Sequence, residues 1–530
     1  MKILFVSNKK NNDPSERELY EMDLMNEILG FRRSLYDLGL LTVMGGTPER
    51  FEVALQDEYV APLDYDEPCD LVALSAKTSC SARAYSVARE FRKRGRKVVL
   101  GGIHASLRPD EALEHVDCIV TGEAEELWPK VLEDFEKGEL KRRYDSAGFP
   151  EMARIPFQRF GNQRPGDFLF QQIQTTRGCP YRCRFCSVPD IAGQEFRFKP
   201  VERVVAEIRA LPRGNAMTRR LQALYMVDDN FLSRVHYTKE LLQALVPLHR
   251  SGELLEWSAE TTLNVAMDEE LLALFHAAGC TTLIIGIESV AAATLQSMQK
   301  GVNFCLTYPE ALERIHRTGM SVVGNFIVGF DTDTLAVFKQ TRDFIFENNI
   351  LYPFFSILTP MPGTALHEEY KAAGRLHHLD WGHYDTRHVV FKPTNMSEAQ
   401  LMDGYVWLYQ QCYATDAALA NLARFWARPE RRGATWMERA WVRWRVARSR
   451  LITPRGRDFF RRAMATMTAR GQKGDVAQLL YYLDSGHFAD FLERFKSPHY
   501  ADHAAQFERG EAIAPRMKTQ WEHKLKLATR

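Results

Sequence analysis

Three cysteines stand close together in the stretch RGCPYRCRFC, at Cys179, Cys183 and Cys186. Their C-x3-C-x2-C spacing directly follows a strand-like apolar run at residues 168–176. Three thiolates on one short loop can hold a metal group that prefers soft ligands, and they leave one metal position open for another molecule. The spacing therefore predicts a metal-dependent reaction centre on this loop.

Two other interpretations of the cysteines remain open on spacing alone. A structural zinc site would need a fourth Cys or His nearby, but the next Cys is Cys280 and the next His is His236. The alternatives are a zinc site completed by a distant ligand and a group of thiols without a metal. Arg177, Arg182 and Arg184 add positive charge, which favours thiolates and a negatively charged cluster.

The elements that must position this loop are alternating strands and helices. From residue 168 to about 358, apolar runs with strand character alternate with amphipathic stretches. Parallel β/α units of this length form a partial (β/α)6 barrel whose active face lies at the C-terminal ends of the strands. Polar residues and glycines stand at those expected ends: Asp228, Asn230, Glu260, Glu288, Ser289, Asn325 and Gly329. A helix cap or turn is the alternative for each, but Glu288 follows an apolar strand, where an unpartnered carboxylate is costly.

Residues 1–140 alternate short apolar runs with helical stretches in the same way, with a helix expected at residues 20–38. Alternation of this kind implies a parallel, doubly wound, Rossmann-like sheet that binds ligands at the strand C-termini. Gly101, Gly102 and Gly122 fall where strands should end, with ordinary turns as the alternative. The fold class is therefore α/β.

The remaining segments complete the expected domain organisation. Residues 141–167 contain several Pro and Gly without a clear period and are expected to be a connector. Beyond residue 390 the pattern is helical, and Ser397 and Gln400 have the spacing of a capping box. The expected domains are a Rossmann-like domain (1–140), the connector (141–167), the partial barrel (168–390) and a helical C-terminal domain (391–530).

Residues 424–462 are rich in arginine, with thirteen Arg against three acidic residues. Trp426, Trp436, Trp441 and Trp444 are interleaved with them. Interspersed Arg and Trp suit peripheral contact with an anionic membrane surface. The alternatives are a helix packed on the barrel with solvated arginines, and a nucleic-acid site, although no recognised nucleic-acid module accompanies the segment.

The composition sets limits on location and partners. With 530 residues and 45% hydrophobic content, the chain should form two or three domains. The net charge of +1 argues against nucleic acid as a general partner. The other cysteines are scattered, which is not the pattern of a disulfide framework and favours a reducing compartment. The opening MKILFVSNKK is expected to form a strand rather than a signal peptide. We therefore expect a cytoplasmic protein, with peripheral contact at the inner membrane face through residues 424–462.

The cysteine motif, placed after one strand and before alternating strands and helices, resembles the radical S-adenosylmethionine (radical SAM) superfamily. The resemblance implies that Cys179, Cys183 and Cys186 bind a [4Fe–4S] cluster whose fourth iron is chelated by SAM. Phe185 matches the aromatic position near the SAM adenine. The motifs MVDDNF, GIES, NFIVGF and TPMPGT recur in the same order in related enzymes and imply SAM contacts for the polar strand-end residues named above.

The stretch VVLGGIHASLRPDEAL, followed by IVTGEAEE, resembles the cobalamin-binding domain that is fused in front of many radical SAM enzymes. There the G-G-x-H and G-E loops line the corrin site, which implies roles for Gly101, Gly102, His104, Gly122 and Glu123. The D-x-H-x-x-G motif, whose His replaces the lower ligand of cobalt, is absent, because no His has an Asp two residues before it. The resemblance covers about residues 1–390.

The resemblance implies an enzyme that uses a [4Fe–4S] cluster, SAM and cobalamin, together with an external electron donor of the flavodoxin or ferredoxin type. The activity implied is C-methylation of an unactivated carbon in a hydrophobic small molecule or lipid, since similar enzymes act on hopanoids, porphyrins and isoprenoid lipids. One rival is a cyclase, oxidase or carbon–carbon coupling enzyme without methyl transfer. Another is a tRNA methylthiotransferase, for which Cys69, Cys80 and Cys118 are too scattered to supply a second cluster. No specific nucleic acid is expected as a partner.

Overall fold

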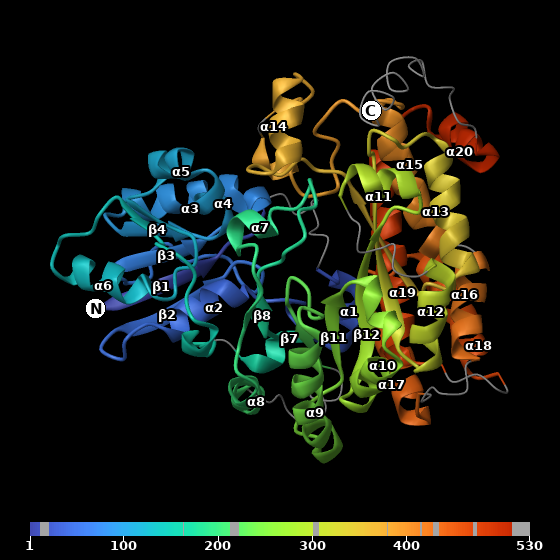
Figure 1. Ribbon diagram of the computed structural model, residues 1–530, viewed down its shortest axis with the longest axis horizontal. Helices are drawn as coiled ribbons and strands as arrows, with labels where there is room; N and C mark the ends of the chain where they lie inside the picture. Colours follow the sequence, from blue (N-terminus) through green and yellow to red (C-terminus); the bar gives the residue numbers. More distant parts are fainter. Residues whose placement is uncertain are drawn as a thin grey trace, which may run out of the picture.

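The computed structural model describes residues 1–10, 21–162, 164–211, 222–299, 307–378, 380–413, 416–427, 434–469 and 474–510 (Figure 1). It contains two large parallel sheets and a set of C-terminal helices. In Figure 1 the first sheet lies at the left in blue, the second lies near the centre in green, and the C-terminal helices lie at the right in orange and red. The α/β class and the three-part architecture predicted from the sequence are confirmed.

The first sheet has six parallel strands in the order β2-β1-β3-β4-β5-β6. They are β1 (Lys2–Ser7), β2 (Glu52–Asp57), β3 (Leu71–Ser75), β4 (Lys97–Gly101), β5 (Cys118–Thr121) and β6 (Arg143–Asp145). The chain adds strands on one side of β1 and then on the other, so that β1 and β3 flank a topological switch point. In sheets of this kind ligands bind outside the carboxyl ends of the strands at the switch point.

Helices cover both faces of this sheet because successive side chains of each strand point to opposite faces. In β1, Ile3 and Phe5 pack under α2 (Leu38–Gly45) and α6 (Trp128–Glu136). Leu4 and Val6 pack on the other face, under α3 (Ser81–Lys93) and α5 (Pro109–His115). The short α4 (Ile103–Leu107) follows β4 directly.

Two local expectations differ from the structure. The expected helix at residues 20–38 is wrong, because α1 (Asp23–Leu29) ends at Gly30, which has a left-handed φ of 86°. The next helix begins only after Asp37, whose side chain accepts a hydrogen bond from the Leu40 amide at 3.0 Å. Within the segment expected to be an irregular connector, residues 143–145 form β6, the edge strand of the first sheet.

The second sheet has six parallel strands in the order β14-β13-β12-β11-β10-β7. They are β7 (Phe170–Ile173), β10 (Ala223–Met226), β11 (Trp257–Thr261), β12 (Cys280–Glu288), β13 (Ser321–Val328) and β14 (Tyr352–Ile357). Its outer helices include α8 (Val201–Ala210), α9 (Val235–Ser251), α10 (Glu269–Ala277), α12 (Tyr308–Arg317) and α13 (Ala336–Glu347). Sequential strand order with a helix after most strands is the pattern of a partial barrel, as predicted.

The strands of the second sheet alternate in burial with a period of two. In β12, Leu283 and Ile285 are fully buried in the core that the outer helices share. Thr282 and Ile284, on the opposite face, are half-buried and line a cavity. The inner face of this sheet is therefore partly open, whereas a closed barrel fills its interior with side chains.

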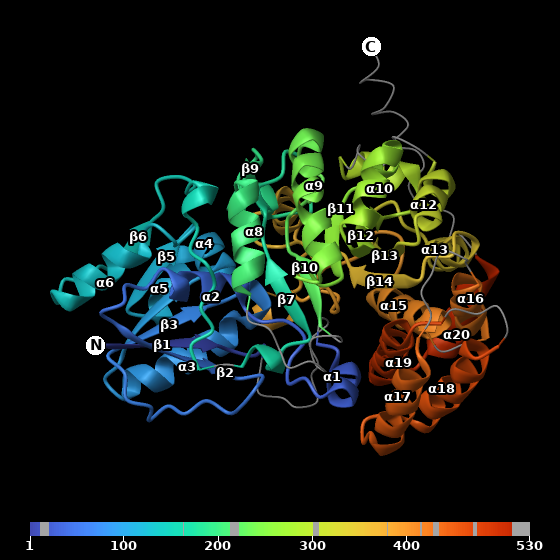
Figure 2. The same ribbon diagram turned by 90° about the horizontal axis from the view of Figure 1, so that it is seen from below.

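The C-terminal helices lie on the inner side of the second sheet. They are α15 (Glu398–Tyr413), α16 (Asp416–Trp426), α17 (Trp436–Arg448), α18 (Pro454–Met467), α19 (Val476–Phe491) and α20 (Tyr500–Arg509). Figure 2 shows α9, α10 and α12 on one side of the sheet and α15 and α19 on the other. The predicted capping box at α15 is confirmed, because the Ser397 amide donates to Gln400 at 2.9 Å and the Gln400 amide donates to Ser397 at 3.1 Å. Among the described helices, none is both long enough and apolar enough to cross a membrane.

Helix α1 is attached to these C-terminal helices although it stands near the start of the chain. Asp484 of α19 accepts hydrogen bonds from the amides of Leu24 and Met25, at 2.8 and 3.0 Å. Arg445 of α17 donates to the carbonyl oxygen of Glu27 at 2.5 Å and to that of Ile28. The carboxylate thus satisfies amides at the N-terminus of α1, and the guanidinium satisfies carbonyls at its C-terminus.

Candidate functional site

The cysteine loop is enclosed by a two-stranded antiparallel pair, β8 (Thr176–Arg177) and β9 (Arg197–Phe198). Gly178 has a φ of 90°, and a Cβ at this position would lie 2.3 Å from the carbonyl oxygen of Glu195. The Cys179 amide donates to the Gly193 carbonyl at 3.1 Å. Only glycine therefore fits at Gly178, and backbone contacts hold the loop in shape.

The three cysteines differ in exposure, since Cys183 is buried and Cys179 and Cys186 are half-buried. The Cys186 amide donates to the Cys183 carbonyl at 3.0 Å, which forms a tight turn between these two residues. Among the residues that the structure describes, no three Cys, His, Asp or Glu side chains are arranged to hold one metal ion. A four-iron cluster does not need three ligands on one metal ion, because each cysteine ligates its own iron.

Acidic partners offset two of the three arginines that were expected to add positive charge around the cysteines. Arg177 donates to Glu125 at 2.6 Å and to Glu123 at 2.5 Å. Arg184 is paired with Glu369 of α14 (Ala365–Ala372). Arg177 and Arg184 therefore anchor the loop to neighbouring elements, whereas Arg182 is exposed and donates to the neutral side chain of Gln194 at 2.5 Å.

Glu123 and Glu125 belong to the loop that follows β5, so their contacts with Arg177 join the two sheets. Arg197 of β9 also donates to Glu123, at 3.1 Å. The side chains of Arg177, Glu123 and Glu125 are about nine-tenths buried. We call these two arginines and two glutamates the inter-domain ion cluster. It fixes the loop after β5 against the base of the cysteine loop.

Replacing Glu123 with glutamine should destabilise the protein, because both arginines would remain buried with a single carboxylate between them. Removing one partner of a buried ion pair typically costs roughly 3 kcal/mol. We expect a clear fall in the melting temperature of Glu123→Gln, measured by differential scanning calorimetry.

Glu151→Gln is the matched control for this prediction. Glu151 pairs with Arg154 at 3.1 Å, but both side chains are 71% exposed, and exposed pairs contribute little. The control should melt at the wild-type temperature. If the two variants melt alike, the inter-domain ion cluster adds nothing measurable to stability.

The acidic residues after β10 hold the backbone around the cysteine loop. Asp228 is buried and accepts hydrogen bonds from the Thr175 amide, the Thr176 amide and the Thr175 hydroxyl, at 2.5, 2.8 and 2.6 Å. Burial raises the pKa of this carboxyl to about 7. Asp229 accepts a hydrogen bond from the Gly178 amide at 2.9 Å. Asp228 thus acts on the turn before the cysteines, a role that its position at a strand end did not reveal.

Asn230 and Ser289 make the local contacts of turn residues. The Asn230 side chain accepts a hydrogen bond from the Leu232 amide at 3.2 Å. The Ser289 hydroxyl accepts one from the Ala291 amide at 3.1 Å. Both residues are buried. These contacts match the turn alternative that the sequence left open.

Glu260, Glu288 and Asn325 all line the cavity on the inner side of the second sheet. The Tyr225 hydroxyl, one strand away, donates a hydrogen bond to Glu260. Glu288 has a φ of 61° and stands at a register shift between β12 and β13. A positive φ is uncommon outside glycine and is found at sites where the surrounding structure enforces it. The structure thus brings together three of the predicted polar residues, and adds Tyr225.

Phe185 and Gly329 come together at the end of β13. The Phe185 ring lies 6.2 Å from the ring of Phe330. The amides of Gly329 and Phe330 donate to Asp333 at 2.9 and 3.0 Å, and burial raises the pKa of Asp333 to about 7. A Cβ on Gly329 would lie 2.8 Å from the side chain of Leu401 in α15. Gly329 therefore allows α15 to pack closely against the strand end.

At the carboxyl edge of the first sheet, Gly102 packs closely against the end of β3. This residue has a φ of 92°, and a Cβ there would lie 2.9 Å from the Ser75 hydroxyl and from the Ala76 amide nitrogen. Gly101 ends β4 beside it, and the Gly122 amide donates to the Ser106 hydroxyl at 2.9 Å. At the switch point, Oδ1 of Asn8 is buried and has no hydrogen-bond partner among the residues that the structure describes.

His104 is fully buried beneath this edge rather than exposed on it. Its Nε2 lies 3.4 Å from Glu111, and its ring lies 5.6 Å from that of Trp381. The Trp381 indole donates to Glu111 at 2.8 Å. Because Trp381 follows the second sheet in the chain, this cluster forms a further bridge between the two sheets.

The carboxyl edges of the two sheets face each other. Lys10, after β1, pairs with Asp385 at 2.8 Å. Gly363, after β14, packs so closely on Leu107 of α4 that a Cβ there would lie 2.9 Å from its side chain. A ligand on the carboxyl edge of the first sheet would therefore lie over the C-terminal ends of the strands of the second sheet, which we call the mouth of that sheet.

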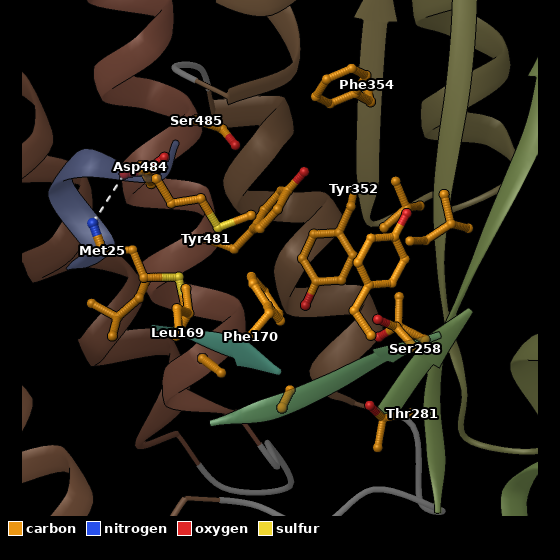
Figure 3. A pocket seen from close by; sticks show the side chains of 18 of the residues that line it. Met25, Leu169, Phe170, Ser258, Thr281, Tyr352, Phe354, Tyr481, Asp484 and Ser485 are labelled. Atoms are coloured by element: carbon orange, nitrogen blue, oxygen red, sulfur yellow. Dashed lines mark hydrogen bonds between the residues drawn. The ribbon is translucent and has the colours of Figure 1, made fainter. Parts of the chain in front are cut away.

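A cavity of about 1100 Å³ extends from that mouth along the inner face of the second sheet. Figure 3 shows its two sides, with Ser258 and Tyr352 contributed by the strands and Tyr481 and Asp484 contributed by α19. The rings of Tyr352 and Tyr481 lie 4.5 Å apart. Met25 of α1 completes the wall. The α1 and α19 contributions were not predicted, because they come from chain segments without a motif.

Two family descriptions match the chain: "Radical SAM superfamily" over residues 173–345 and "B12 binding domain" over residues 31–132. Bacteriochlorophyllide d C-12(1)-methyltransferase from Chlorobaculum tepidum is 31% identical over 393 residues, which are 73% of this chain and 84% of the relative. Hopanoid C-2 methylase from Rhodopseudomonas palustris is 27% identical over 364 residues, which are 67% of this chain and 68% of the relative.

Two solved structures share the fold. The cobalamin-dependent S-adenosylmethionine radical enzyme OxsB has a TM-score of 0.59 and 14% identity, over 97% of this chain and 84% of that chain. The radical S-adenosylmethionine methyltransferase TsrM from Kitasatospora setae has a TM-score of 0.54 and 17% identity, over 70% of this chain and 78% of that chain. The family matches and the sequence relatives show that the chain belongs to the radical SAM superfamily, in the group whose members also have a B12-binding domain.

Proposed function

We propose that this enzyme is a cobalamin-dependent radical SAM methyltransferase that methylates an unactivated carbon of a hydrophobic, ring-containing small molecule. The proposal rests above all on the cavity of about 1100 Å³. Ligand pockets usually measure about 300 to 1000 Å³, so this one has room for a large molecule. Its aromatic wall suits a flat ring system. The names of the relatives, which refer to bacteriochlorophyllide and hopanoid, point to polycyclic substrates as well.

The residues present fit the cofactors of this family. Cys179, Cys183 and Cys186 would ligate the [4Fe–4S] cluster on a loop that the backbone already shapes. Gly102 lets the segment after β3 pack closely on the end of β4, which shapes the carboxyl edge at the switch point, and the buried Oδ1 of Asn8 can accept a hydrogen bond from an amide. These features support a corrin site at the switch point of the first sheet.

The carboxylates at the mouth of the second sheet would hold SAM. Glu260 and Glu288 complement its positively charged sulfonium and ammonium groups, and Asn325 offers both a donor and an acceptor. Phe185 would stack near the adenine. When bound, the cluster and SAM supply hydrogen abstraction and cobalamin supplies the methyl group. The protein orients these groups, and the aromatic cavity excludes water from the reacting carbon.

The charge of the cavity disfavours an anionic substrate. Among the described residues that line it, several are Asp or Glu and none is Lys or Arg. A phosphate or carboxylate buried there would find no cationic partner, and an unpaired buried charge is costly. We therefore include a neutral ring system in the proposal. Reduction of the cluster would come from an external donor of the flavodoxin or ferredoxin type.

Filling the cavity should separate methyl transfer from the chemistry of the cofactors. Ser258 projects into the cavity from β11 (Figure 3). In Ser258→Trp, the indole should take the space of the substrate, so methylation falls at least tenfold while iron content and SAM binding stay unchanged. Incubation with SAM and neutral polycyclic lipids, followed by mass spectrometry for added methyl groups, measures this loss.

Ala82→Trp provides the matched control, because Ala82 is exposed on α3 and does not line the cavity. This variant should methylate at the wild-type rate. Full activity of Ser258→Trp would place the substrate elsewhere. Loss of iron or of SAM binding in the same variant would show that the tryptophan disturbs the cofactor sites instead.

We also propose that the chain contacts a membrane through residues 424–462. Part of this segment is packed on the protein, since Trp426 is fully buried and Arg445 is bound to α1. Arg428, Glu430, Arg431 and Arg432 lie outside the described residues. The outer face of α17 remains available and supports the contact with exposed aromatic and cationic side chains.

A further inference from the structure

Helix α17 exposes large apolar side chains to solvent. Trp436, Met437 and Trp444 are 71%, 57% and 50% exposed, and they are the most concentrated group of exposed large hydrophobic residues in the described chain. Exposure of single large residues is ordinary, but a cluster on one helix marks an interaction surface. The outer face of α17 therefore offers a surface to which a binding partner could attach.

The charge of this face identifies the partner as an anionic lipid surface. Arg443 and Arg448 of α17, and Arg450 just after the helix, are exposed, and the Arg448 guanidinium lies 4.3 Å from the centre of the Trp444 ring. Tryptophan and arginine side by side are typical of helices that lie in the membrane interface. The arginines complement anionic headgroups, and the indoles fit at the level of those headgroups.

The inner face of the same helix forms part of the cavity wall. Glu438 and Trp441 line the cavity, and Val442 and Val446 are buried against neighbouring helices. Trp441, which lines the cavity, and Trp444, which is exposed to solvent, are three residues apart, less than one helical turn. The single helix α17 therefore separates the lipid-facing side chains from the cavity. A hydrophobic molecule leaving a bilayer at α17 would meet the cavity wall first.

We infer that α17 docks the enzyme on an anionic membrane and that the cavity is loaded with its hydrophobic substrate from that membrane, past Trp441. This inference rests on the proposed function, because it assigns the cavity to a hydrophobic substrate. Loading from the bilayer spares such a substrate the passage through water, which disfavours exposed apolar surface.

An acidic electron-donor protein is the other partner that a cationic face could attract. It would need to approach the cysteine loop to deliver its electron. Figure 1 shows α17 at the lower right of the molecule, far from α7 (Val188–Ile191), which directly follows the cysteines. The position of α17 therefore favours the membrane.

The inference can be tested with dehydroergosterol, a neutral fluorescent polycyclic alcohol, as the probe. Phosphatidylcholine vesicles with or without phosphatidylglycerol, and cyclodextrin in solution, serve as donors of the probe to the intact protein. Wild type should float with the anionic vesicles and take up the probe much faster from them than from neutral vesicles. Replacing Arg443, Arg448 and Arg450 with glutamine should weaken vesicle binding roughly a hundredfold and abolish the advantage of anionic vesicles.

Control variants separate docking from loading. Glutamine at Arg154, Arg209 and Arg317, which are exposed elsewhere on the protein, should leave vesicle binding unchanged. Ser258→Trp should bind vesicles like wild type but fail to take up the probe from any donor. Together these results would show that the membrane contact and the cavity are distinct parts of one route.

Three results would overturn the inference in distinguishable ways. Uptake from cyclodextrin without any dependence on vesicles would overturn membrane loading and leave the proposed function intact. No uptake from any donor would contradict the proposed substrate class as well. If the arginine variant floats like wild type but is reduced more slowly by a flavodoxin, the α17 face serves an acidic protein.

Discussion

Replacing Cys183 with alanine is expected to abolish both iron binding and SAM cleavage. Wild type purified without oxygen should be brown and contain about four iron atoms per chain, as expected for one cysteine-ligated cluster. Cys183 is buried between the two other cysteines of the loop, where water cannot easily replace a missing ligand. Iron analysis, the visible spectrum and 5′-deoxyadenosine production measure the loss.

Cys118→Ala is the matched control for the cluster prediction. Cys118 is buried in β5 of the first sheet, away from the cysteine loop, and burial raises the pKa of its thiol to about 12. It packs as a small apolar side chain rather than as a ligand. The control should keep its iron. Iron and SAM cleavage that persist in Cys183→Ala would contradict the assignment of the cysteine loop.

Replacing Gly102 with leucine is expected to abolish cobalamin retention while leaving the iron content unchanged. The added side chain would begin 2.9 Å from Ser75 and Ala76, so it would push apart the ends of β3 and β4 that shape the switch point. Wild type should retain stoichiometric cobalamin through gel filtration, and the variant should lose it. With substrate, wild type should form 5′-deoxyadenosine and S-adenosylhomocysteine in equal amounts, and the variant should form no S-adenosylhomocysteine.

Gly95→Leu is the control that separates the steric clash of the leucine with Ser75 and Ala76 from backbone strain. Gly95 has a φ of 76°, but no atom lies within 4 Å of a Cβ built there. Both variants place leucine in the left-handed region, so strain alone would affect them alike. The control should retain cobalamin. Wild-type product formation without S-adenosylhomocysteine would instead indicate a cyclase or oxidase that uses the same cofactors without methyl transfer.

The sequence predicted both sheets because strand periodicity is a local property. Runs such as LVALS and TTLIIGI are apolar enough to be buried on one or both faces wherever they fold, and the structure has strands over both. Helix boundaries were less certain, as the break of the expected helix at residues 20–38 shows. That break follows from Gly30 and Asp37, a helix stop and a helix start within one short stretch.

The contacts of the polar strand-end residues were decided by tertiary structure. Asp228 lies two residues after β10 and Glu260 is the last but one residue of the neighbouring β11, and Asp228 is bound to Thr175 and Thr176 whereas Glu260 faces the cavity. Strand position fixes which edge and which face of the sheet a residue reaches. Which partners it meets there depends on loops that are distant in sequence.

The sequence by itself determined the chemistry of this protein, and the tertiary structure determined where the substrate can bind. Motif residues such as Cys179 and Gly102 can be recognised because their spacing and their backbone demands are local. The cavity wall has no such signature, because it forms only when Asp484 of α19 and Arg445 of α17 bind the two ends of α1, more than 400 residues away. A pocket made by helices from opposite ends of a chain depends on how their surfaces fit together, and the spacing of residues along the sequence does not contain that information.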